Sequence, residues 1–171
     1  MRLKTICLTA AIFLAVPFQS ALAEIQIPDS ATITTDDATL KELEVFYDEI
    51  EKALADEDIN KLMSFYAEDY LHRGITKVQL RFMWLEIFNT YQELYSIHAF
   101  SRIHVNGPDA ILGCSGALLG VKKAGEDYAA VDRWVDTNHW VTKVNGEWKM
   151  VGGASHKGST FKKSDDTHPL F

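Results

Sequence analysis

Cysteine is scarce in this sequence of 171 residues, which contains only Cys7 and Cys114. Cys7 falls in an N-terminal segment that we expect to be removed, so Cys114 would remain alone and no intramolecular disulfide could form. Cys114 lies between Gly113 and Ser115 in an apolar stretch. That setting is more typical of a buried small side chain than of a reactive nucleophile. The fold must therefore be held by its core.

The sequence also lacks a surplus of positive charge. Lys and Arg number 17 against 24 Asp and Glu, which gives a formal net charge of −7. Loss of Arg2 and Lys4 with the N-terminal segment makes the remaining chain about −9. This sign opposes binding to a phosphate backbone or to an anionic membrane surface. We expect no nucleic-acid partner.

Motifs for metals, nucleotides and covalent catalysis are missing as well. There is no HExxH, no paired CxxC and no glycine-rich phosphate loop, and GCSG at residues 113–116 lacks the spacing of a nucleophile elbow. His98 and His104 would lie about 20 Å apart along an extended strand, which is too far to share an ion. The sequence therefore predicts neither a metal nor another cofactor.

One hydrophobic run stands out, at the N-terminus. Arg2 and Lys4 precede an apolar stretch at residues 5–16, and Ala-Leu-Ala at residues 21–23 offers the small residues that signal peptidase requires. The run is shorter than the roughly 20 residues that span a membrane. We predict that residues 1–23 are a cleavable signal peptide and that the protein is exported, to the periplasm rather than fully secreted, without membrane insertion.

Three helices are predicted after a short leader. Residues 24–36 contain Pro28, several Ser and Thr and no periodicity, which predicts a flexible leader. Apolar residues then recur at three- and four-residue steps over 37–56, with Thr39 and Glu42 at capping-box spacing. Asp58 and Thr76 are expected to cap a second and a third helix, of which the third ends near residue 90.

The periodicity then changes from 3.6 to two, which predicts strands. Four strands are expected at residues 95–105, 110–121, 128–144 and 147–154. Their connections are short, and Asn145-Gly146 favours the type I′ turn of a hairpin. Helices followed by an antiparallel meander indicate one α+β domain at residues 37–156. The polar residues 157–171 predict a loose C-terminal tail.

This order of elements resembles the nuclear transport factor 2-like superfamily, which includes SnoaL-like cyclases and ketosteroid isomerases. Residues 58–70, DINKLMSFYAEDY, are similar to the family's second helix with its Tyr-Ala-x-Asp close. Residues 140–151, WVTKVNGEWKMV, resemble its last hairpin. The resemblance implies a cystatin-like cone, in which three helices pack in the curl of an antiparallel sheet of four or more strands around an apolar cavity.

Candidate cavity residues follow from this resemblance and from the alternation of the third strand. Asp136 shares one face of that strand with Trp134 and Trp140, and His139 lies on the other face if no bulge intervenes. Parity alone leaves open which face lines the cavity and whether either row instead faces solvent or a dimer partner. The side chains that we expect to line a ligand site are Phe82, Met83, Trp134 and Trp140, and the acid–base candidates are Tyr70, Asp136, His139 and His156.

Two functions remain open. The absence of a complete acid–base constellation favours a binding protein without catalysis, which would hold a small apolar molecule or a partner protein and dimerise through its sheet. The alternative is a cofactor-independent isomerase, cyclase or dehydratase that uses Asp136 or His156 with Tyr70 or His139. The steroid-isomerase variant is weakened because residues 70–74, YLHRG, contain no carboxylate.

Overall fold

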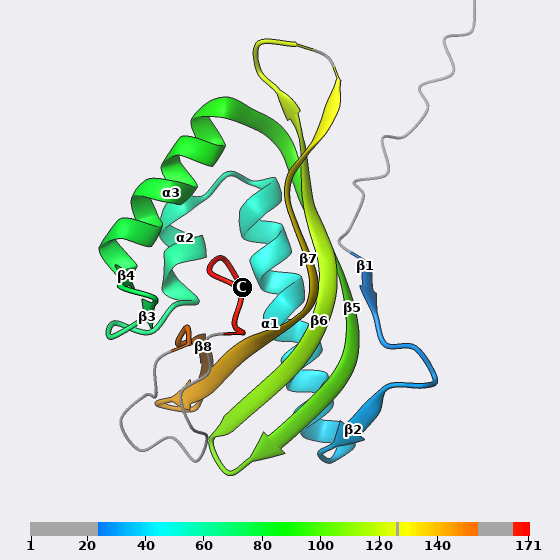
Figure 1. Ribbon diagram of the computed structural model, residues 1–171. Helices are drawn as coiled ribbons and strands as arrows, with labels where there is room; N and C mark the ends of the chain where they lie inside the picture. Colours follow the sequence, from blue (N-terminus) through cyan, green and yellow to red (C-terminus); the bar gives the residue numbers. More distant parts are fainter. Residues whose placement is uncertain (1–23, 126, 154–165) are drawn as a thin grey trace, which may run out of the picture.

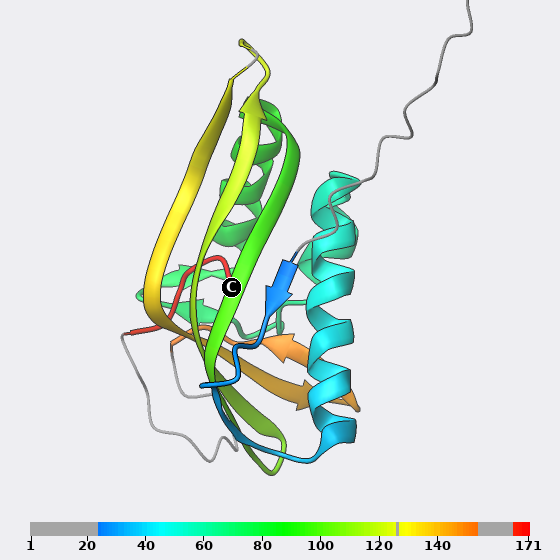
Figure 2. The same ribbon diagram turned by 90° about the vertical axis from the view of Figure 1, so that its right-hand side faces the viewer.

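The computed structural model describes residues 24–125, 127–153 and 166–171, and shows three helices packed on the concave side of a curled six-stranded sheet (Figures 1 and 2). This confirms the predicted α+β cone. In chain order, the elements are β1 (Glu24–Gln26), β2 (Thr32–Thr34), α1 (Asp37–Ala55), α2 (Ile59–Ser64), β3 (Leu71–His72), β4 (Ile75–Thr76), α3 (Lys77–Thr90), β5 (Tyr91–Asn106), β6 (Asp109–Lys122), β7 (Tyr128–Val144) and β8 (Glu147–Met150).

The helices begin where short polar side chains satisfy free backbone N–H groups. Asp58 caps α2 and Thr76 caps α3, as predicted. Thr76 does so in a capping box with Gln79. For α1 the cap is Asp36, which accepts from the Thr39 N–H, so the helix begins at Asp37 as predicted and its first turn lies before the Thr39–Glu42 spacing. Within the described residues, no helix is long and apolar enough to cross a membrane.

The sheet is a meander of long antiparallel strands with two short additions. β5, β6, β7 and β8 pair in sequence order, and Asn145 and Gly146 both have positive φ in the β7–β8 turn, as a type I′ turn requires. β1 and β2 pair with β5 in parallel. The predicted flexible leader is therefore partly ordered, because two of its segments complete the hydrogen-bond ladder of β5.

The C-terminal prediction fails for the last six residues. Residues 166–171 return to the inside of the cone, where Leu170 and Phe171 are each only 3% exposed (Figure 1). Their apolar side chains join the main core of helices and sheet. The prediction of a loose tail failed because these contacts are with residues far away in the sequence, which local polarity does not reveal.

A β-bulge in β7 changes which side chains face the core. Cys114 pairs with Thr137 and Gly116 with Trp134, so one residue of β6 lies opposite both Val135 and Asp136. Asp136 has φ of 49°, and its N–H donates to the Ser115 hydroxyl at 2.9 Å. The extra residue reverses the alternation, because side chains otherwise switch face at every step.

Gly116 makes room for the Trp134 indole. A Cβ at this position would lie 2.1 Å from the Ile97 carbonyl oxygen and 2.6 Å from the indole. We expect Gly116→Ala to lower the free energy of unfolding by about 1–3 kcal/mol, because backbone and ring must both move. Chemical denaturation measures this change. Gly125→Ala is the matched control, since no described residue beyond its chain neighbours lies within 4 Å of its added Cβ, and an equal loss there would contradict the explanation.

Candidate functional site

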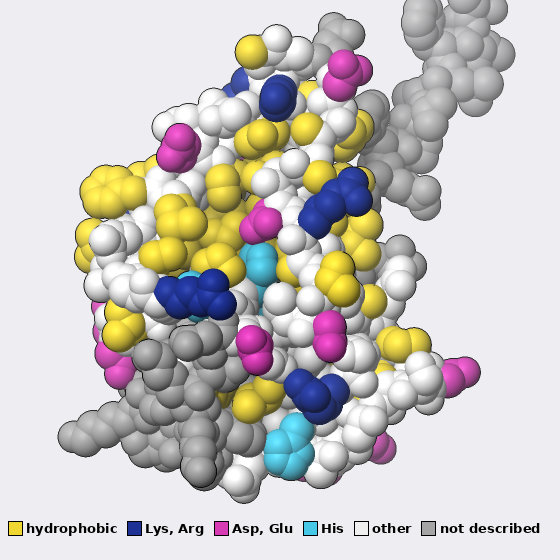
Figure 3. Space-filling view, in the orientation of Figure 1, with side chains coloured by type: hydrophobic (Ala, Val, Ile, Leu, Met, Phe, Trp, Pro, Cys, Tyr) yellow, Lys and Arg dark blue, Asp and Glu magenta, His cyan; other side chains and the backbone are white. Residues whose placement is uncertain are grey.

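The C-terminal segment, residues 166–171, occupies the inside of the cone. The chain end lies between the helices and the curled sheet in Figure 1, and apolar side chains gather over α3 and the neighbouring sheet on the face shown in Figure 3. The backbone of the segment pairs with β7, where the Asn138 N–H donates to Asp166 O and the His168 N–H donates to Asn138 O. The segment therefore lies where the family resemblance implies a ligand cavity.

The Phe171 ring lies in an aromatic cage. Its centroid is 4.8 Å from that of His98, 5.2 Å from Trp134, 5.9 Å from His139 and 6.0 Å from Trp84. The contacts range from stacked to edge-on, which are the favourable arrangements of aromatic pairs. The cage is therefore shaped to accept a flat aromatic group.

Two tyrosines hold the backbone next to this ring. The Tyr66 hydroxyl donates to Leu170 O and the Tyr70 hydroxyl donates to Pro169 O, each at 2.5 Å. Burial raises the pKa of both hydroxyls above the usual value for tyrosine. Both groups therefore keep their protons at neutral pH and present O–H donors to the inside of the cone.

The segment is also fastened at the mouth of the cone. His168 Nε2 lies 3.2 Å from the Asp132 carboxylate, and Thr167 Oγ1 is 2.9 Å from His72 Nδ1. The His168 hydrogen bond is the main cause that lowers the pKa of Asp132, while partial burial opposes the change. Side chains from two different parts of the chain thus retain the C-terminal segment.

A polar chain runs through the core beneath the cage. The buried Glu51 carboxylate of α1 accepts from the N–H and the hydroxyl of Ser96. The Ser96 oxygen lies 2.6 Å from His98 Nε2. Because this hydroxyl donates to Glu51, its oxygen accepts the Nε2 proton of His98, which leaves Nδ1 as an acceptor directed at Cys114 Sγ, 3.5 Å away.

Cys114 and His139 complete this buried polar group. Cys114 Sγ accepts from Trp134 Nε1 at 3.3 Å, and burial raises the pKa of the thiol to about 12. A thiol with such a pKa is a weak nucleophile. His139 Nδ1 lies 3.0 Å from the Tyr47 hydroxyl, and burial lowers the pKa of the imidazole well below its usual value, so the ring is neutral.

The structure brings three of the residues predicted from sequence to the interior. Tyr70, Trp134 and His139 all contact the C-terminal segment. Trp134 and His139 were assigned to opposite faces of the strand, and the bulge at Asp136 places both inside. Met83 is half-buried against the core.

The other candidates lie elsewhere. Asp136 is exposed at the bulge and Phe82 is 66% exposed on the outer side of α3, so neither lines the interior. Trp140 is buried in a separate small cluster with Ala67 and Val151. His156 lies outside the described residues.

Sequence reasoning missed His98, Cys114, Trp84 and Phe171 as parts of one site. The sequence suggested only His104, on the same strand, as a second metal ligand for His98. The residues that His98 meets, Cys114 and His139, lie instead on β6 and β7. Trp84 was hidden in a helix that is apolar on most sides. The apolar end Pro169-Leu170-Phe171, which closes a polar tail, was a usable signal.

A separate surface groove is less suited to specific binding. It is open, has a volume of about 770 Å³ and lies between α1, α2 and the β7–β8 hairpin. Its charged residues are already paired, with Lys61 on Glu49 at 3.2 Å and Lys149 on Glu147 at 2.7 Å. The interior is therefore the better candidate.

Comparison with solved structures identifies the fold. No family model and no curated protein matches the sequence. A conserved protein from Planctomyces limnophilus matches with a TM-score of 0.58 at 14% identity, over 68% of this chain and 94% of that one. A proposed aromatic ring hydroxylase from Novosphingobium aromaticivorans matches with a TM-score of 0.54 at 16% identity, over 70% of this chain and 88% of that one.

A proposed scytalone dehydratase from the same species matches with a TM-score of 0.53 at 14% identity, over 67% of this chain and 80% of that one. The chain shares the α+β cone fold of these proteins, which is the fold that the resemblance to the nuclear transport factor 2-like superfamily implies. Identities this low establish the fold and not an activity, since one fold carries many functions. The residues inside the cone must decide the function.

The Asp132–His168 pair yields a prediction for the C-terminal segment. Asp132→Asn removes the charge that holds His168, so we expect residues 166–171 to exchange their amide hydrogens faster. The stability loss should be below about 1 kcal/mol, because Asp132 is partly exposed. Hydrogen exchange with mass spectrometry measures the effect. Asp136→Asn, on the same strand but exposed, serves as control, and equal exchange in both variants would refute the role of the pair.

Proposed function

We propose that this protein binds a small, largely apolar molecule with an aromatic group inside its cone, without transforming it. The observation that carries this proposal is the Phe171 cage, which already holds a flat ring between Trp134, His98 and His139. Without a ligand, the C-terminal segment occupies the binding site, and it moves aside when the ligand binds. Concave sites that combine aromatic walls with a few directed polar groups are typical of small-molecule binding.

The polar groups of the cage narrow the ligand class. The hydroxyls of Tyr66 and Tyr70 donate to two successive backbone carbonyls of the C-terminal segment. A ligand that replaces the segment must offer acceptors to these donors, because leaving both unpaired would cost about 1–3 kcal/mol each. Aromatic ketones, quinones and esters meet this requirement.

The first test is what the protein carries. Native mass spectrometry of protein purified from its own host should show a bound molecule of this class, released unchanged on denaturation. Tyr66→Phe and Tyr70→Phe should each weaken binding of a carbonyl-bearing aromatic by about 0.5–1.5 kcal/mol, as loss of one hydrogen bond predicts. If the carbonyl-bearing aromatic binds equally well to both variants, the two donors do not contact it.

Removal of the C-terminal segment gives a second prediction. A chain without residues 166–171 should bind an apolar fluorescent probe about tenfold or more tightly than the full chain, because a site blocked in most molecules loses apparent affinity in proportion. Fluorescence titration measures this ratio, with circular dichroism to verify folding. Phe82→Ala is the control, since Phe82 is an exposed phenylalanine outside the cone. Unchanged affinity in the shortened chain would show that the segment does not block the site.

Acid–base catalysis is the second candidate, and His139 is the residue that favours it. Its imidazole is fully buried and neutral, and its Nε2 has no hydrogen-bond partner in the described part of the chain. A neutral ring nitrogen of this kind could accept a proton from a bound ligand. Recovery of an isomerised or dehydrated ligand that is lost in His139→Gln would support an enzyme and overturn pure binding.

Export and self-association belong to the same proposal. We propose that the predicted N-terminal signal directs the protein to the periplasm, where it would meet its ligand outside the cytosol. On β7, Tyr128 and Val135 are 61% and 81% exposed, and they supply apolar surface for a homodimer through the sheet. Analytical ultracentrifugation tests this, because Val135→Glu should turn a dimer through this surface into a monomer. A dimer that persists in the variant would use another surface.

A further inference from the structure

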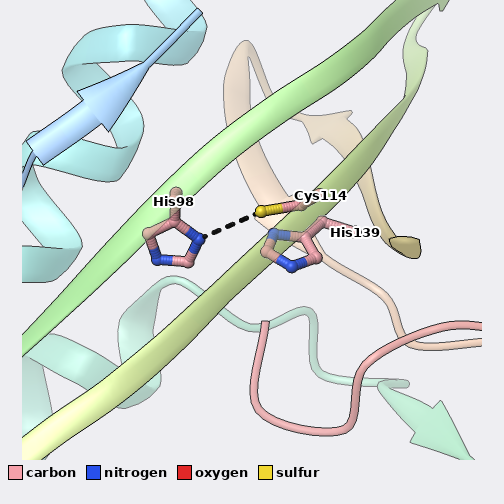
Figure 4. A group of neighbouring side chains, drawn as sticks. All are labelled: His98, Cys114 and His139. Atoms are coloured by element: carbon pink, nitrogen blue, oxygen red, sulfur yellow. Dashed lines mark hydrogen bonds between the residues drawn. The ribbon is translucent and has the colours of Figure 1, made fainter. Parts of the chain in front are cut away.

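Three side chains with metal-ligating atoms meet on the concave face of the sheet. His98 comes from β5, Cys114 from β6 and His139 from β7, and they point toward one another (Figure 4). One ligand atom from each lies within 4.8 Å of the other two. All three side chains have no exposed surface. The proposed ligand binding uses the imidazole faces as cage walls and leaves these atoms unused.

The spacing of the first two atoms matches a coordination polyhedron. His98 Nδ1 and Cys114 Sγ are 3.5 Å apart. With zinc–sulfur and zinc–nitrogen bonds of about 2.3 and 2.0 Å, the nitrogen–sulfur edge of a tetrahedron is also about 3.5 Å. Any two of the three ligand atoms lie within 4.8 Å of each other, an upper bound that is wider than the edge of about 3.5 Å in such a tetrahedron. A bound ion would draw the His139 ring toward the other two ligands until the edges of the polyhedron are met.

Each of the three side chains has a partner that fixes it from behind. His98 Nε2 is bound to Ser96, which in turn is bound to Glu51. Cys114 Sγ accepts the Trp134 indole N–H, an interaction that favours a thiolate. His139 Nδ1 is bound to the Tyr47 hydroxyl. Outer partners of this kind orient the ligands in metal sites.

One nitrogen in this group points to a missing partner. His139 Nε2 is buried and makes no hydrogen bond within the described residues. Buried polar atoms nearly always have a partner, so each exception calls for an explanation. A metal ion bound to Nε2 would supply one once the His139 ring turns this nitrogen toward His98 and Cys114, with the Tyr47 hydrogen bond then fixing the tautomer.

We propose that His98, Cys114 and His139 bind one thiophilic transition-metal ion, Zn²⁺ or Cu⁺. Two imidazoles and a thiolate suit these ions, whereas Mg²⁺ and Ca²⁺ require oxygen ligands. Binding forms the metal–sulfur bond and releases the Cys114 proton to solvent. The Glu51 carboxylate, joined to His98 through Ser96, offsets part of the ion's charge.

Cobalt spectroscopy provides the test, with Co²⁺ as the probe. The full chain is unfolded, stripped of metal with a chelator and refolded with Co²⁺, so that the closed interior does not bar entry. We expect one equivalent of Co²⁺, visible absorption of a tetrahedral site and a near-ultraviolet thiolate-to-cobalt band, all lost on addition of Zn²⁺. Without the charge-transfer band in the unaltered chain, the proposal fails.

Variants assign the ligands. Cys114→Ser, which is nearly isosteric, should abolish the charge-transfer band, and His98→Gln and His139→Gln should each weaken Co²⁺ binding at least about tenfold. His104→Gln, on the same strand as His98 but outside the cluster, should leave binding unchanged. Circular dichroism without metal shows which variants fold, and Cys114→Ser carries the test if a histidine variant does not. The assignment would be overturned if the thiolate-to-cobalt band persisted in Cys114→Ser, or if His104→Gln weakened Co²⁺ binding as much as His98→Gln does.

Discussion

The bulge at Val135 and Asp136 is the constraint on which the interior of the cone depends. Trp134 and His139 are five residues apart, so an unbroken strand would send them to opposite faces. With one extra residue, both side chains enter the cone and meet Cys114 from the neighbouring strand. The positive φ of Asp136 is the local cost, and the Ser115 hydroxyl that binds its N–H offsets part of it.

The same bulge explains why a glycine lies opposite Trp134. The indole turned inward by the bulge crosses the position that a side chain at residue 116 would occupy. Gly116 leaves that space empty, and the indole can then place its N–H on Cys114 Sγ. The backbone irregularity, the glycine and the thiol therefore act as one unit.

This interior is more polar than the fold requires for packing alone. Glu51, His98 and His139 are all buried, and taking such groups out of water is unfavourable unless hydrogen bonds replace the lost hydration. Ser96 and Tyr47 form hydrogen bonds with most of these polar atoms, and His139 Nε2 is the one without a partner among the residues that the structure describes. Since apolar residues would fill the same volume at lower cost, the polar cluster is better explained by binding or chemistry than by stability.

The sequence was sufficient for the fold and insufficient for the site, for a physical reason. Helical and alternating periodicity are local, so α1, α3 and the four strands of the meander were predicted to within about four residues. The second helix was expected to run on toward Gly74 and instead ends at Ser64. The site depends instead on a bulge, on register across three strands and on the return of residues 166–171. None of these leaves a repeated local pattern, and only the apolar end at Pro169-Leu170-Phe171 hinted at burial.

The C-terminal segment links the cage to the polar cluster beneath it. Phe171 covers His98 and His139 and keeps water from their ring nitrogens. If the segment moves aside, water or a ligand reaches His139, whose Nε2 then gains a partner and whose pKa is no longer lowered by burial. The energy stored in that unpaired nitrogen favours opening, while burial of Leu170 and Phe171, about 1.5–3 kcal/mol for each fully buried side chain, opposes it. Burial of both side chains, together about 3–6 kcal/mol, exceeds the roughly 1–3 kcal/mol of one unpaired nitrogen, and the hydrogen bonds of Tyr66 and Tyr70 add to it. A bound aromatic molecule must therefore replace these contacts to take the place of Phe171.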